Sequence, residues 1–135
     1  MSSVRVVDIG GGITSENFAD VAERRIKEGR PEEGSKGKFF DGLTTSKLRS
    51  IYAMIVNVQS RMDGPDAFEV IKPDLQYLKV RMAYEAGRER SVKVFLDKTG
   101  LMDAIGRVKD CEEFTLFCRY AESLVAYFKY YGGRD

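Results

Sequence analysis

The stretch DCEEFTLFCRYAESLVAYFKYYGG, residues 110–133, has the pattern of one long amphipathic helix. Asp110 and Glu113 have the spacing of a capping box, and Gly132 and Gly133 are typical of a helix end. At about 100° per residue, most apolar side chains fall on one broad face, which predicts a helix packed on a core. That face holds Phe114, Phe117, Cys118, Ala121, Leu124, Val125, Phe128 and Tyr131, with Tyr120 and Tyr127 at its edge.

The aromatic residues at the end of this stretch allow a second interpretation. Aromatic rings interleaved with a cation can stack on nucleic-acid bases. Tyr130 fits this interpretation best, because it falls opposite the core face, near Ser123 and close to the angle of Arg119. A lone exposed aromatic ring needs no functional explanation, so both interpretations of Tyr130 stay open.

The same periodicity predicts further helices upstream. The expected segments are residues 14–28, residues 44–62, a short turn after Pro65, a long helix opened by Pro73, and a helix from about residue 89 that Thr99 and Gly100 interrupt. The helix after Pro73 is apolar on two faces, which predicts a central position in the bundle. One face holds Leu75, Leu78 and Met82, and the other holds Tyr77, Val80 and Tyr84. Nothing alternates with period two beyond a hint in VRVVDI, residues 4–9. The expected fold class is therefore all-α, a compact bundle of about five helices.

A glycine-rich connection divides the expected domain. Residues 28–42, EGRPEEGSKGKFFDG, contain four glycines and one proline, which predicts a loop or tether. The expected organisation is a single domain in which residues 1–40 form an N-terminal segment with a short helix and the tether, and residues 41–135 form the helical-bundle core.

Two glycine-containing stretches superficially resemble nucleotide-binding loops. IGGGIT, residues 9–14, lacks G-x-G-x-x-G and is expected to be flexible. GRPEEGSK, residues 29–36, lacks the Gly-Lys-[Ser/Thr] order of a P-loop, and its two acids would repel phosphate. Neither stretch therefore predicts a nucleotide site.

Composition narrows the function classes. The chain of 135 residues is 43% hydrophobic and 32% charged, as in soluble globular proteins, and it has no membrane-length apolar run or signal-peptide pattern, so the cytoplasm is expected. It has no histidine, and Cys111 and Cys118 are expected to be small buried hydrophobes that do not bridge. The acids are scattered over caps and loops. We therefore expect no enzyme activity, no cofactor and no metal.

The basic residues are unevenly distributed, although the net charge is only +1. Residues 43–62 contain no Asp or Glu but include Lys47, Arg49 and Arg61. Arg81 and Arg88 are seven residues apart and so lie on one side of a helix. An acid-free face with arginines slightly favours contact with an RNA or DNA backbone, and a solvated face that lacks Glu by chance remains the alternative.

Three motifs together resemble a known family. GLTTSKLRSIY (42–52), LKVRMAYEAGR (78–88) and FCRYAESLVAYFKYYGG (117–133) are similar, in order and spacing, to the small helical subunit of type III-A CRISPR (Csm) interference complexes. The resemblance covers roughly residues 40–133, and Ser123 and Phe128 depart from it. It implies an all-α, non-catalytic subunit that takes part in antiviral defence. Several copies would line the complex beside the guide RNA and touch RNA through its backbone.

The resemblance also implies site residues and partners. Motif position points to Lys47, Arg49, Arg88, Arg119 and Lys129 as RNA-binding, and helical geometry adds Arg61, Arg81 and Arg90. The expected partners are guide RNA, target RNA, neighbouring copies of the chain, and the large polymerase-like and backbone subunits of the complex, with no membrane. The alternative is a helical protein–protein adaptor without direct RNA contact, because Arg and Tyr are also enriched at protein interfaces.

Overall fold

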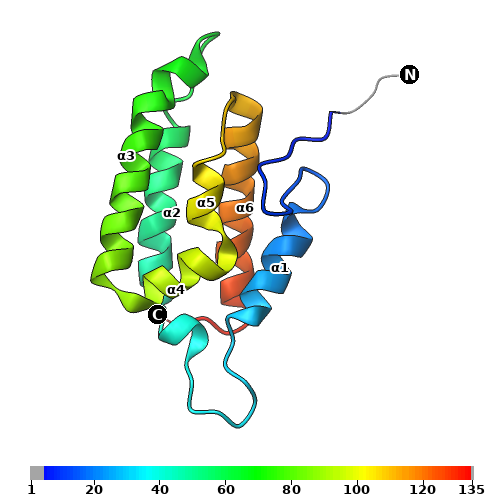
Figure 1. Ribbon diagram of the computed structural model, residues 1–135, viewed down its shortest axis with the longest axis vertical. Coiled ribbons are helices and arrows are strands. Elements are labelled where there is room, and N and C mark those ends of the chain that lie inside the picture. Colours follow the sequence, from blue (N-terminus) through cyan, green and yellow to red (C-terminus); the bar gives the residue numbers. More distant parts are fainter. Residues whose placement is uncertain (1–4, 135) are drawn as a thin grey trace.

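The computed structural model describes residues 5–134, which fold into one helical bundle (Figure 1). The all-α prediction is confirmed: within this range there are no strands, only an isolated bridge between Asp8 and Thr14. The elements are α1 (Phe18–Glu28), the 3₁₀ turn η1 (Phe39–Asp41), α2 (Thr45–Gln59), α3 (Ala67–Arg88), α4 (Arg90–Thr99), α5 (Leu101–Ile105) and α6 (Cys111–Tyr130).

Helix α6 packs between α1 and α2, and its ends are as the sequence predicts (Figure 1). The Asp110 carboxylate accepts from the Glu113 amide at 2.8 Å, and the Glu113 carboxylate accepts from the Lys109 amide at 2.9 Å. The aromatic side chains of the core face are buried, and Tyr130 is 77% exposed. Tyr131, expected on the core face, is only half-buried because it follows the last helical residue.

Helix α3 begins earlier than predicted. It is continuous over 22 residues, so Pro73 lies inside it rather than at its first turn. Ala67 and Ile71, which precede Pro73, are already buried in the core. This burial explains why the helix begins before the proline. Pro73 itself is exposed, and its ring costs the helix one backbone hydrogen bond.

The prediction that this helix is central was also wrong. Leu75, Leu78 and Met82 are buried, but the second apolar face of α3 points to solvent and the helix lies at the edge of the bundle (Figure 1). The exposed fractions of that face are 61% for Tyr77, 60% for Val80 and 61% for Tyr84.

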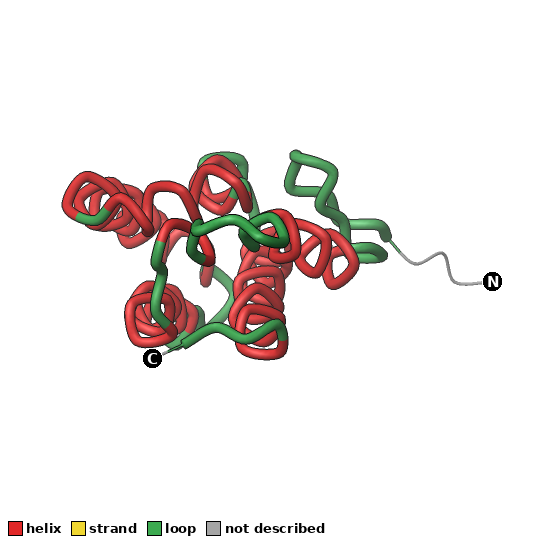
Figure 2. The backbone as a smooth tube through the Cα atoms, turned by 90° about the horizontal axis from the view of Figure 1, so that it is seen from below, coloured by secondary structure: helices red, strands yellow, loops and turns green. Residues whose placement is uncertain are grey.

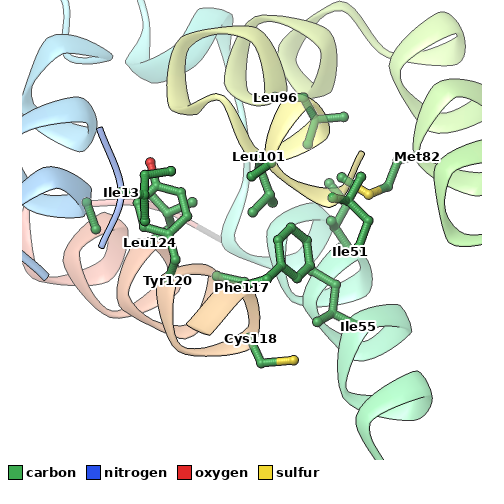
Figure 3. Close-up of a cluster of buried hydrophobic side chains, with 14 of the residues drawn as sticks. Ile13, Ile51, Ile55, Met82, Leu96, Leu101, Phe117, Cys118, Tyr120 and Leu124 are labelled. Carbon is green, nitrogen blue, oxygen red and sulfur yellow. The ribbon is translucent and has the colours of Figure 1, made fainter. Parts of the chain in front are cut away.

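The glycine turn near the N-terminus is packed rather than flexible. Ile9 and Ile13 are each 1% exposed, and Figure 3 shows Ile13 in the same buried cluster as Tyr120 and Leu124 of α6. The three glycines between the isoleucines have φ values of 78°, 63° and 79°, a left-handed backbone that glycine adopts without strain. This turn is therefore built to place two isoleucines in the core.

The connection over residues 29–38 is irregular, as predicted, and ends in two phenylalanines that enter the core. The ring of Phe40 lies 5.2 Å from that of Phe95, and Phe39 lies 4.7 Å from Phe128. Figure 2 views the bundle from the end where this connection and the C-terminus lie. The core thus continues from the N-terminal segment into the other helices as one hydrophobic cluster.

Candidate nucleic-acid interface

The seam between α2 and α3 brings three of the predicted site residues together. Lys47 of α2 and Arg81 and Arg88 of α3 line a shallow cleft of about 260 Å³. Two carboxylates, Glu85 and Glu89, lie on the same cleft. The Lys47 ammonium contacts the Glu89 carboxylate at 2.8 Å, and this hydrogen bond lowers the pKa of Glu89.

Each of the two cleft arginines lies over a tyrosine ring one helical turn earlier. The Arg81 guanidinium is 5.9 Å from the centre of the Tyr77 ring, and that of Arg88 is 5.8 Å from Tyr84. A hydrogen bond with the Tyr84 hydroxyl raises the pKa of Arg88. The two pairs are seven residues apart, so they repeat at ~10 Å along the helix. The result is an exposed ladder of alternating rings and cations.

Sequence reasoning did not name Tyr77 and Tyr84 as candidate site residues, because it placed them on a second apolar face of a central helix. A signal was nevertheless present, because Tyr-x-x-x-Arg occurs twice in register, at residues 77–81 and 84–88. Side chains four residues apart are neighbours on a helix surface, so this spacing brings each ring beside its cation.

Arg61 and Arg90 lie at opposite ends of the seam, and both form ion pairs. Arg61 contacts Asp74 of α3 at 2.7 Å, and Arg90 contacts Asp41 of η1 at 3.0 Å. The side chain of Arg90 remains 82% exposed. Exposed ion pairs contribute only ~0–1 kcal/mol, so both guanidinium groups could exchange a carboxylate for a phosphate at small cost.

Arg49 is exposed on the outer face of α2, with no ion pair to the part of the chain that the structure describes. The neighbouring hydroxyls are engaged by their own helix, since Ser50 donates to the Ser46 carbonyl at 3.1 Å and Ser60 donates to the Asn57 carbonyl at 2.7 Å. Arg49 is thus an exposed cation on a helix, α2, that contains no acidic residue.

The two predicted residues on α6 are not part of the α2–α3 seam. Arg119 lines a separate groove of about 550 Å³ between α1 and α6, together with Phe18, Glu122 and Tyr130. Lys129 is exposed in the last turn of α6. The eight predicted residues therefore occupy more than one face, and the densest group is Lys47, Arg81 and Arg88.

Two further kinds of feature, a metal-binding cluster and a membrane-spanning helix, are absent from residues 5–134. No cluster of three or more His, Cys, Asp or Glu side chains has an arrangement that could hold a metal ion. No helix in this range has the length and apolar character needed to cross a membrane.

Comparison with known proteins agrees with the three motifs. A family described as Csm2 Type III-A matches residues 30–134. The Streptococcus thermophilus protein named CRISPR system Cms protein Csm2 is 41% identical over 123 residues, covering 91% of this chain and 98% of that protein. Proteins of the same name from Enterococcus italicus and Mycobacterium tuberculosis are 36% identical over 120 residues and 37% identical over 97 residues. They cover 82% and 69% of this chain and 86% and 78% of their own lengths. Matches of this extent and identity show that the chain belongs to the type III-A Csm2 family.

Proposed function

We propose that the chain is a non-catalytic small subunit of a type III-A CRISPR effector complex in the cytoplasm. In this role it contacts the backbone of guide or target RNA through the α2–α3 face, as part of antiviral defence. Its protein partners are neighbouring copies of itself and the large and backbone subunits of the complex. The observation that carries the RNA contact is the ladder of Arg81 and Arg88 on tyrosine rings beside Lys47.

The chemistry of the ladder suits a sugar–phosphate backbone. A guanidinium offers a planar fork of donors to phosphate oxygens, and stacking on a ring restricts its orientation before binding. The exposed faces of Tyr77 and Tyr84 can also stack on bases without reading their identity. Such contacts tolerate any RNA sequence. A subunit of this complex requires this tolerance, because base pairing with the guide RNA recognises the target.

The first test is reversal of charge at Arg49 or Arg88. In a reconstituted complex, Arg49→Glu and Arg88→Glu should each weaken target-RNA binding, measured by filter binding across a salt series. Each lost phosphate contact should reduce the slope of log K against log salt by ~0.7 to 0.9. Both side chains are exposed, so circular dichroism should show an unchanged fold.

A matched control is Lys72→Glu. Lys72 is also exposed on α3 but lies on the side away from the ladder, where it pairs with Glu69 at 3.4 Å. This variant should bind RNA as the unmodified chain does. Unchanged RNA binding in Arg88→Glu would remove the α2–α3 face from the proposal, whereas Arg49→Glu tests the outer face of α2, which is not part of the α2–α3 cleft.

The exposed apolar stripe of α3 favours a second candidate, a protein–protein adaptor. Val70 is 55% exposed and extends the line of Tyr77, Val80 and Tyr84, which resembles the aromatic and apolar centre of a protein interface. Association with another subunit that survives high salt, and that Val80→Asp abolishes, would favour this candidate. Association lost at high salt would favour the RNA contact.

A further inference from the structure

Another cavity lies away from the α2–α3 seam. It has a volume of about 1100 Å³ and sits at the end of the bundle where the 29–38 connection, the start of α2 and the C-terminus gather (Figure 1). Its wall combines the end of α1, the connection, η1 and the residues that follow α6. We call it the end pocket, and its charged lining residues are Lys27, Arg30, Glu33, Lys38 and Arg134.

The lining of the end pocket is strongly positive. Among residues 5–134, four cations and one carboxylate, that of Glu33, line it, although the chain as a whole carries a net charge of only +1. The cations come from the end of α1, from the connection and from the C-terminal residues, so folding has gathered them. The C-terminal part of the wall is tied to α2 by a hydrogen bond of 2.6 Å from the Thr45 amide to the Arg134 carbonyl.

Tyr131 positions two of these cations. The Lys27 ammonium and the Arg30 guanidinium lie 5.4 Å and 5.6 Å from the centre of the Tyr131 ring. The Tyr131 hydroxyl donates to the Glu23 carboxylate at 2.6 Å, which orients the ring. Glu23 does not line the pocket, although a hydrogen bond with Tyr131 and the negative charge of Glu23 both raise the pKa of Lys27.

Strained backbone lies next to the pocket, between two of its lining residues, Phe39 and Gly42. Phe40 and Asp41 have φ values of 44° and 57°, a left-handed conformation that non-glycine residues rarely adopt, and Gly42 follows with φ 94°. The Phe40 ring is packed so tightly on Gly29 that a Cβ there would lie 2.1 Å from the ring. Such strain costs about 1–3 kcal/mol per residue and clusters where a ligand is clamped. Phe39 and Gly42, on either side of the strained residues, both line the cavity.

We propose that the end pocket is an anion site that binds a phosphate group, carried by a free nucleotide or by an RNA strand. Convergent cations match the charge of phosphate, and the guanidinium of Arg30 offers it paired donors. The inference does not depend on the α2–α3 face. The GRPEEGSK stretch has two acids, and only one of them, Glu33, lines the pocket. Three of the four cations of the pocket lie outside that stretch, so its acids do not prevent phosphate binding.

The test is a titration of the full chain, labelled with ¹⁵N, with inorganic phosphate, with adenosine monophosphate and with a short single-stranded RNA. The amides of Gly37, Gly42 and Gly132 line the pocket and should shift on binding. Gly64 and Gly87 lie outside the pocket lining and should not shift. If the pocket glycine amides shift with phosphate or nucleotide but not with RNA, the natural ligand is a free phosphate compound. If RNA binds more tightly than the nucleotide, the natural ligand is an RNA strand.

The matched variants are Arg30→Glu with Lys38→Glu, and Lys36→Glu alone. Lys36 belongs to the same connection but does not line the pocket, so its reversal should leave the shifts unchanged. The double variant should bind at least about tenfold more weakly, since each charged hydrogen bond contributes ~1.5–3 kcal/mol. Arg30→Gln and Lys38→Gln repeat the test with a smaller change, should the double variant fold poorly.

The variant Arg88→Glu separates this site from the proposed function. It should weaken RNA binding by the complex but keep the phosphate-induced shifts of the pocket glycines. Absence of those shifts with all three ligands, or equal binding by the double variant and the unmodified chain, would overturn the proposal even if the α2–α3 face binds RNA.

Discussion

Cys118 is a residue whose chemistry is changed strongly by burial. Its side chain lies in the core cluster shown in Figure 3, and burial raises the pKa of the thiol to about 12. The reactive thiolate is therefore scarce at any pH at which the fold is stable. Cys111 is the first residue of α6 and is only half-buried.

Alkylation should distinguish the two thiols. With the chain folded at pH 8, iodoacetamide should modify Cys111 and leave Cys118 largely unmodified, and denaturant should expose both. Peptide mass spectrometry measures the two sites in one sample, with Cys111 as the internal control. Equal modification of both thiols in the folded chain would mean that this part of the core opens readily.

Arg25 joins three segments through one side chain. Its guanidinium donates to the Thr99 carbonyl at 2.7 Å, to the Tyr120 hydroxyl at 3.1 Å and to the Gly11 carbonyl. Helical spacing correctly predicted that Tyr120 borders the core face, but it carried no information on this network. The partners belong to segments far apart in sequence, and periodicity describes only neighbours on the same helix.

At the level of a single element, the start of α6 depends on one carboxylate. The hydrogen bond from the Glu113 amide is the largest cause that lowers the pKa of Asp110, and Arg5, 3.3 Å away, acts in the same direction. Because the folded pKa lies below the unfolded one, this cap stabilises the fold above the ordinary value of 3.8. The stabilisation is lost as pH falls through the folded pKa.

Replacing this cap should lower stability by a predictable amount. Asp110→Ala should reduce the free energy of unfolding at pH 7 by ~1 kcal/mol, while Asp110→Asn keeps an acceptor and should lose less. Urea unfolding at pH 7 and again below pH 3.8 should show that the cost of Asp110→Ala shrinks in acid. Asp97→Ala, an exposed position in α4, serves as control. A cost that does not change with pH would assign the effect to something other than the ionised cap.

Helix α3 shows where element prediction stops. Its apolar residues were placed on the correct two faces, and the face of Leu75, Leu78 and Met82 is indeed buried. Spacing could not tell which face a neighbouring helix would cover, because that depends on the packing of the other elements. The proline rule misplaced the helix start for a related reason: burial of Ala67 and Ile71 outweighs the local preference for Pro73 at a first turn.

At the scale of the whole molecule, folding brings together charges that no window of the sequence contains. The basic residues of the α2–α3 seam were predictable because Arg81 and Arg88 share one helix and Lys47 lies in an acid-free window. The end pocket was not, since Lys27 and Arg134 meet only when the chain closes back on itself. Local pattern therefore singled out the basic residues that line the α2–α3 cleft, but not those of the pocket, which only the tertiary structure brings together.

The N-terminal residues provide the last prediction, which concerns the cooperativity of the fold. The sequence predicts a single domain in which residues 41–135 form the core and residues 1–40 form an N-terminal segment. Ile13, however, is 1% exposed and packs in the same cluster as α6, so Ile13→Ala should cost ~2–5 kcal/mol of the free energy of unfolding, in one cooperative transition. Val6→Ala, at a position 48% exposed in the same segment, should cost little. Urea unfolding followed by the near-ultraviolet signal of the seven tyrosines of the chain measures both. An Ile13→Ala variant with unchanged stability would mean that residues 1–40 fold apart from the bundle. A large loss of the free energy of unfolding would mean that the first glycine turn belongs to the same cooperative core that supports the α2–α3 face and the end pocket.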